Sequence, residues 1–84
     1  FWLAEHHFSG YGILGNPLVF ASAIAQRTRR ITIGTAVMVI PFYNPMRLAE
    51  DAALVDVLSN GRLVLGCGRG YQPKEFAGFG IDPK

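Results

Sequence analysis

Apolar and polar positions along the chain form blocks that predict strands and helices in alternation. The first four residues, Phe1 to Ala4, are a short apolar run typical of the end of a strand, and residues 5–15 read as a loop rich in glycine. Asn16-Pro17 is typical of a helix N-cap followed by proline at the first helical position. We therefore expect a helix from Pro17 to Thr28.

The middle of the chain repeats this order of strand and helix. Residues 31–40 are rich in β-branched side chains and nearly free of charge, which favours one continuous strand covered on both faces, as in parallel sheets. Asn44-Pro45 repeats the capping signal, so a second helix is expected over residues 46–59. Its apolar face should carry Leu48, Ala52 and Val55, with Leu54 and Leu58 beside them.

The last third of the chain predicts one more strand and a turn. Gly61 lies where a helix needs a residue with positive φ, residues 62–67 predict a strand, and residues 66–70 predict a glycine-rich turn. The order β-α-β-α-β with short loops indicates an α/β fold with parallel strands. A doubly wound sheet and a (β/α)8 barrel both remain open, and both bind ligands at the carboxyl ends of the strands.

Composition narrows the class of protein. The 84 residues are 50% hydrophobic and 17% charged with a net charge of +2, which excludes a disordered segment and gives little support for a nucleic-acid partner. No apolar run reaches the roughly 18 residues of a membrane span. A single cysteine excludes an internal disulfide framework, and we expect a cytoplasmic location. Because the chain starts without Met inside an apolar run, we expect a partial domain, incomplete at both ends.

Two histidines follow the first predicted strand. The side chains of His6 and His7 should point in opposite directions, so one can face a site while the other packs. Imidazole can transfer protons near neutral pH, which makes catalysis one interpretation and plain packing the other. Metal binding is the weakest interpretation, because adjacent ligands converge poorly and no third ligand is evident, so we expect no metal.

A second candidate is the glycine-rich segment over residues 66–70. Its glycines allow close approach of the backbone to a ligand, and Arg69 offers a guanidinium for an anion or a ring carbonyl. It is not the dinucleotide fingerprint, because the spacing is G-x-G-x-G and Pro73 falls where the helix of that motif should be running. A tight turn with a solvated arginine is the alternative. The lone Cys67 is expected to be a buried small hydrophobe.

Taken together, these segments resemble the bacterial-luciferase-like flavin-dependent monooxygenase family. The matching stretches occur in the family's order: residues 2–8, 15–17, 33–37, 41–51 and 59–70. The resemblance implies that residues 1–84 are part of a luciferase-like (β/α)8 TIM barrel, with strands two to four of that barrel. It also implies an enzyme that uses reduced FMN and O2 to oxidise a small organic substrate such as an aldehyde, sulfonate or alkane, although the segment alone should be inactive.

The resemblance also assigns site residues and partners. His6 matches the histidine that handles protons beside the flavin, and Ala36 and Val37 match a strand end that often carries a cis peptide against the flavin ring. Arg69, flanked by Gly68 and Gly70, matches an arginine that contacts the flavin. Glu5 and Glu50 match acidic positions near the mouth of the barrel, and we expect them to have only supporting roles. An NAD(P)H-dependent flavin reductase and a dimeric full-length protein are expected. An F420-dependent oxidoreductase of the same barrel family and a non-catalytic partner subunit like the luciferase β chain are the alternatives.

Overall fold

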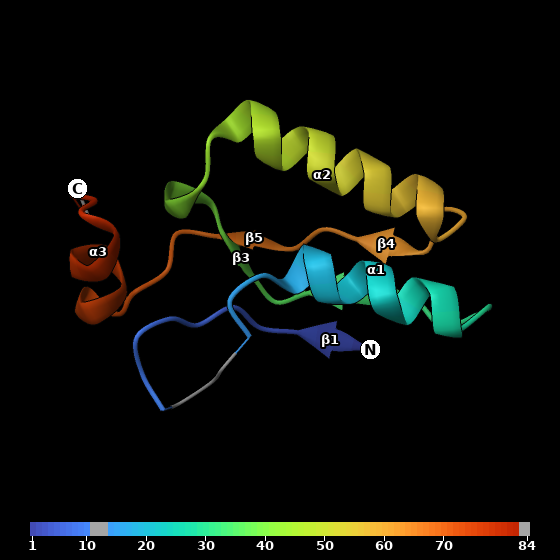
Figure 1. Ribbon diagram of the computed structural model, residues 1–84, viewed down its shortest axis with the longest axis horizontal. Helices are drawn as coiled ribbons and strands as arrows, with labels where there is room; N and C mark the ends of the chain where they lie inside the picture. Colours follow the sequence, from blue (N-terminus) through green and yellow to red (C-terminus); the bar gives the residue numbers. More distant parts are fainter. Residues whose placement is uncertain (11–13, 83–84) are drawn as a thin grey trace.

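The computed structural model describes residues 1–10 and 14–82, so part of the predicted glycine loop, residues 11–13, lies outside the described residues, as do residues 83–84. Strands and helices alternate through most of this length, which confirms the predicted α/β class (Figure 1). In chain order the elements are β1 (Trp2–Leu3), α1 (Pro17–Arg27), β2 (Ile33–Thr35), β3 (Met38–Val39), the 3-10 helix η1 (Ile40–Phe42), α2 (Pro45–Leu58), β4 (Leu63–Val64), β5 (Cys67–Gly68) and α3 (Pro73–Phe79).

The two long helices begin where the capping signals predict. The Asn16 side chain accepts hydrogen bonds from the backbone N–H groups of Leu18 and Val19, at 3.1 and 3.3 Å. Asn44 does the same for the first turn of α2. In both helices proline occupies the first turn, where no backbone donor is needed. The predicted positive φ of Gly61 is also confirmed, at +76°.

The strands are parallel and form two short sheets in line with each other. The first has the order β1-β2-β4, and the second pairs β3 with β5. Gly34 pairs with Val64 and Met38 with Cys67, so three residues on one strand (35–37) lie opposite two on its neighbour (65–66). This is a bulge, and it makes the prediction of one continuous strand over residues 31–40 wrong.

The gap in the ladder at the bulge is closed by a side chain. The Thr35 hydroxyl donates to the carbonyl oxygen of Gly66 at 2.8 Å and accepts from the Gly66 N–H at 3.0 Å. Thr35 is fully buried, and a Cβ on Gly66 would collide with the Thr35 carbonyl oxygen. Glycine is therefore required at position 66 by the close approach of the two strands.

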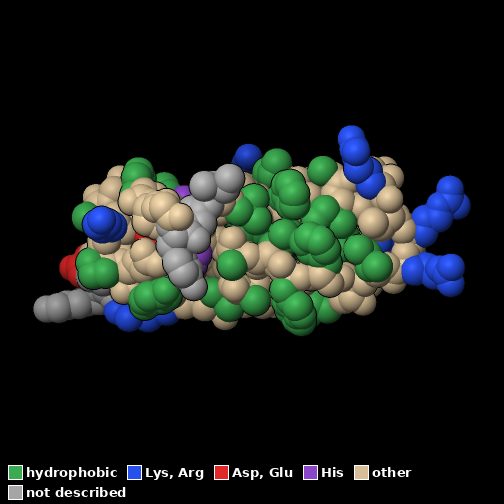
Figure 2. Space-filling view, turned by 90° about the horizontal axis from the view of Figure 1, so that it is seen from below, with side chains coloured by type: hydrophobic (Ala, Val, Ile, Leu, Met, Phe, Trp, Pro, Cys, Tyr) green, Lys and Arg blue, Asp and Glu red, His purple; other side chains and the backbone are tan. Residues whose placement is uncertain are grey.

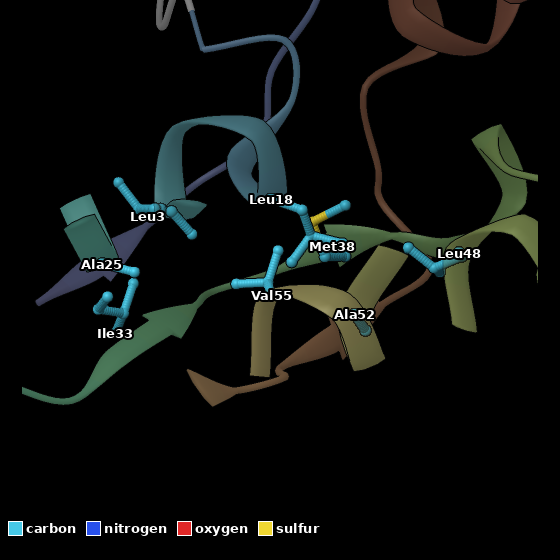
Figure 3. Close-up of a cluster of buried hydrophobic side chains, with 9 residues drawn as sticks. Leu3, Leu18, Ala25, Ile33, Met38, Leu48, Ala52 and Val55 are labelled. Carbon is cyan, nitrogen blue, oxygen red and sulfur yellow. The ribbon is translucent and has the colours of Figure 1, made fainter. Parts of the chain in front are cut away.

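Helices α1 and α2 lie side by side and cover one face of the sheet. The core between the layers holds the side chains drawn in Figure 3, in which residues of both helices point toward those of β1, β2 and β3. Leu48, Ala52 and Val55 of α2 are buried there, as their spacing predicts, whereas Leu54 and Leu58 beside them are exposed. The core residues are Leu3, Leu18, Ala21, Ala25, Ile33, Met38, Leu48, Ala52 and Val55.

Several features of the last third differ from prediction. The strand predicted over residues 62–67 is interrupted, because only Leu63–Val64 (β4) and Cys67–Gly68 (β5) are paired, in different sheets. The glycine-rich stretch is therefore not wholly a turn, since β5 pairs with β3. The seven-residue helix α3 was not predicted, and its first residue, Pro73, occupies the first helical position. Cys67 is exposed, so the prediction that it is buried is wrong.

The surface below β1 and α1 is rich in apolar side chains (Figure 2). Phe1, Phe20 and Ile31 are exposed, and with Ile24 they line a hollow beside α1. Basic side chains protrude at one end of this face. Within residues 1–10 and 14–82, no helix has the length and apolar character that crossing a membrane requires.

Candidate functional site

The carboxyl ends of the strands meet around a small cavity of about 110 Å³. Ala4 to His6 contribute from the end of β1, Ala36 and Val37 from the bulge, and Gly70 and Tyr71 from the segment after β5. Parallel α/β folds bind ligands at this edge of the sheet, and the sequence analysis predicted that the candidate residues would lie here.

Glu5 ties the end of β1 to the neighbouring strand. The residue is 2% exposed, and its carboxylate accepts the backbone N–H of Val39 at 2.9 Å and lies 2.5 Å from His7 Nε2. Burial raises the pKa of the Tyr43 hydroxyl above its ordinary value of 10.0, and the charge of Glu5 and a hydrogen bond to it raise that pKa further. Glu5 is thus a buried anchor of the site. Glu50 is exposed on α2, 3.9 Å from Arg47, and the structure places it away from the cavity lining.

The two histidines point to different surroundings, as the strand geometry predicts. His6 lines the cavity, with its Nδ1 3.1 Å from the Glu75 carboxylate. His7 packs edge-on against Phe42 and Phe79, with ring centroids 5.6 and 4.7 Å away. His6 is therefore the imidazole that lines the cavity, and His7 is a packing residue paired with Glu5.

The Ala36–Val37 peptide bond is cis, and both residues line the cavity. Ala36 is exposed and Val37 half-buried, so the small side chain of Ala36 leaves the backbone accessible from the cavity. A cis bond at this position agrees with the resemblance found in the sequence.

The glycine-rich segment packs closely against the bulge. A Cβ on Gly68 would lie 2.6 Å from Val37 Cγ2, and one on Gly70 would lie 2.7 Å from Val39 Cγ1. Gly70 also has a φ of +81°, in the region that favours glycine. Of the predicted residues here, Gly70 lines the cavity, Gly68 contacts its wall, and the Arg69 side chain is exposed outside the lining.

Sequence reasoning missed Glu75 of α3. The residue is 1% exposed and its carboxylate contacts both the ring of His6 and the backbone of His7. It lies 69 positions from His6, on a short helix that was not predicted, and no local pattern marks it. Within the described residues, no three His, Cys, Asp or Glu side chains are grouped to hold a metal ion.

Small side chains form part of this edge, and the described residues hold no group of metal ligands there. Small residues, Ala4, Ala36 and Gly70, leave backbone accessible around the cavity, and His6 adds a group that exchanges protons. The exposed Arg69 guanidinium lies next in sequence to the lining residue Gly70 and offers five donors to an anionic group.

Comparison with known proteins identifies relatives over nearly the whole chain. The alkanal monooxygenase alpha chain of the Kryptophanaron alfredi symbiont is 44% identical over 96% of this chain and 23% of its own length. Limonene 1,2-monooxygenase of Rhodococcus erythropolis is 42% identical over 99% of this chain and 21% of its own. The chain thus spans under a quarter of the length of these relatives.

Two solved structures share the fold closely. A monooxygenase from Streptomyces bottropensis matches with a TM-score of 0.92 and 39% identity, over 96% of this chain and 25% of that one. The oxygenating constituent of 3,6-diketocamphane monooxygenase from Pseudomonas putida, solved in complex with FMN, matches with a TM-score of 0.90 and 26% identity, over 95% and 22% of the two chains. The model of the family described as "Luciferase-like monooxygenase" matches residues 1–84, the whole chain. The chain belongs to the luciferase-like monooxygenase family.

Proposed function

We propose that the complete protein is a flavin-dependent monooxygenase that uses reduced FMN and O2 to oxidise a small organic substrate of the aldehyde, sulfonate or alkane class. The observation that carries this proposal is the convergence of His6, the Ala36–Val37 peptide and Gly70 on one cavity at the carboxyl ends of the strands. Family membership and a structural neighbour in complex with FMN support the choice of cofactor.

The same proposal includes the architecture of the complete protein. Three strand–helix steps in a parallel sheet, in sequence order, are what strands two to four of a (β/α)8 barrel require. The exposed apolar face over β1 and α1 (Figure 2) supports this, because a face of that kind needs cover from further chain or from a partner. We also propose that the enzyme is cytoplasmic and dimerises. It would receive its reduced flavin from an NAD(P)H-dependent reductase.

Each proposed site residue has a defined task. His6 exchanges a proton with the bound reactants, and Ala36 and Val37 present backbone to one side of the flavin ring. Gly68 and Gly70 keep that wall free of side chains, and Arg69 binds an anionic part of the flavin by charge-assisted hydrogen bonds. When bound, reduced FMN supplies the electrons that activate O2.

Activity of the full-length protein tests the role of His6. With reduced FMN supplied by a flavin reductase and NADH, His6→Ala should still bind flavin but lose turnover by about 100-fold or more, as expected for loss of a proton-transfer group. Arg30→Ala, an exposed change on the loop after α1, is the matched control. Full turnover in His6→Ala would show that His6 is not catalytic.

Titration with both cofactors separates the alternatives. Binding of FMN with O2-dependent oxidation supports the monooxygenase. Binding of F420 in place of FMN, with hydride transfer that needs no O2, would replace it with an oxidoreductase of the same barrel family. A full-length protein that binds neither flavin but forms a tight heterodimer would instead be a non-catalytic partner subunit.

A further inference from the structure

Glu75 connects helix α3 to the residues that follow β1. Its Oε2 atom accepts the backbone N–H of His7 at 2.7 Å and lies 3.1 Å from His6 Nδ1. Its side chain is 1% exposed, and a buried carboxylate is costly unless donors surround it. The two contacts therefore explain how this acid is tolerated inside the protein.

The contacts of the Glu75 carboxylate favour one tautomer of His6. As a carboxylate, Glu75 can only accept, and its Oε2 atom accepts the backbone N–H of His7. The same oxygen has a second lone pair, and His6 Nδ1 is within hydrogen-bond distance of it. Nδ1 must then carry the ring proton, because two acceptors at 3.1 Å would repel each other.

Gln72 and Tyr71 also lie near this ring. Glu5, the second buried carboxylate, contacts the other imidazole, that of His7. Gln72 Nε2 lies 3.5 Å from His6 Nδ1, at the outer limit of a hydrogen bond, and its amide can turn to present either atom. The Tyr71 ring lies edge-on to His6 at 6.4 Å between centroids.

We propose that Glu75 is a positioning residue that holds the ring proton of neutral His6 on Nδ1, so that Nε2 is the atom that accepts a proton during the reaction. Glu75 acts through His6 and touches no reacting atom. The inference rests on the proposed function for the use made of Nε2, whereas the tautomer itself belongs to the protein without any cofactor.

Nuclear magnetic resonance of the ligand-free full-length protein tests the tautomer directly. With ¹⁵N-labelled histidine at about pH 8.5, above the ordinary imidazole pKa, the protonated and unprotonated ring nitrogens give well separated shifts. Loss of signals in His6→Gln assigns the residue. The wild-type protein should show a proton on Nδ1 of His6, and a proton on Nε2 instead would overturn the inference whether or not any variant folds.

Three variants separate positioning from simple structural support. Glu75→Met removes the acceptor and should move His6 toward the Nε2-protonated form. Glu75→Gln should keep the Nδ1 proton, because the His7 N–H orients the amide oxygen into the Oε2 position. Gln72→Ala, the matched control on the same ring atom, should leave the tautomer unchanged. An unchanged tautomer in a folded Glu75→Met protein would overturn the inference.

Kinetics then connect the tautomer to the reaction. Glu75→Met should lower kcat by roughly tenfold or more with little change in KM, since an incorrectly placed proton impairs chemistry rather than binding. An unchanged kcat in a protein whose tautomer has shifted would overturn the role of Nε2. If wild-type protein shows the Nδ1 proton but neither binds flavin nor turns over, the tautomer assignment stands and the proposed function fails.

Discussion

Arg62 connects the end of helix α1 to the segment that follows helix α2. Its guanidinium donates five hydrogen bonds, one for each N–H group. Nε donates to Ser59 O at 2.7 Å, and Nη1 donates to Thr28 Oγ1 at 2.9 Å and to Ile31 O at 3.0 Å. Nη2 donates to Ala25 O at 2.9 Å and to Thr28 O at 3.1 Å. The Ala25 carbonyl is among those left without a partner at a helix end, where a positive charge is also favoured. Arg62 is therefore expected to be the main stabiliser of this end of the molecule.

The cost of removing Arg62 follows from these bonds. A hydrogen bond from a charged donor contributes about 1.5–3 kcal/mol by itself, but the five act together at a half-buried site and water replaces part of them. We therefore expect Arg62→Ala to lower the free energy of unfolding by about 3 kcal/mol. Arg62→Lys keeps the charge at the helix end but has no planar fork, so it should lose about half as much.

Urea denaturation of the full-length protein measures these changes, from the shift of the midpoint multiplied by the slope m. Arg30→Ala removes an exposed arginine from the same end and should change stability by less than about 0.5 kcal/mol. The reasoning fails if Arg62→Ala costs no more than Arg30→Ala, or if Arg62→Lys is as stable as the wild-type protein.

Two further predictions concern the bulge and the buried tyrosine. Gly66→Ala places a methyl group against the Thr35 carbonyl and should cost about 3 kcal/mol or prevent folding, whereas Gly10→Ala, with no atom within 4 Å, should be nearly neutral in the same urea titration. A raised pKa in the folded state means that Tyr43 contributes stability below pH 10.0 that is lost as the pH rises above it. Stability measured from pH 9 upward should therefore fall more steeply in the wild-type protein than in Tyr43→Phe, and equal slopes would contradict the assignment.

Local chemistry explains why the helices could be predicted so closely. Each asparagine–proline pair acts within its own first turn, so the predicted starts of α1 and α2 lie within one residue of the observed ones. The apolar face of α2 follows from spacing alone. Helix α3 has seven residues with Gly78 near its end, and so short a segment carries too little periodicity to predict.

The site was harder to predict than the helices, because its main contacts join distant parts of the chain. His6 could be proposed from its residue type and place after a strand, but its partner Glu75 is brought to it only by the packing of α3. Phe8, whose ring occupies the space where Gly78 would carry a Cβ, helps to fix that packing. Nothing in the spacing of residues 5–8 and 73–79 indicates that they meet.

The bulge explains why the glycine-rich segment needs its glycines, which the spacing of the glycines in the sequence could not show. In a regular strand, successive side chains face opposite sides, so only one of two neighbours can line a given cavity. The extra residue in 35–37 allows both Ala36 and Val37 to line this one. Gly66 and Gly68, two positions apart and so on one face, leave room for that extra residue at Thr35 and Val37. The glycines of the neighbouring strand are thus needed to shape the wall of the site, before any ligand is considered.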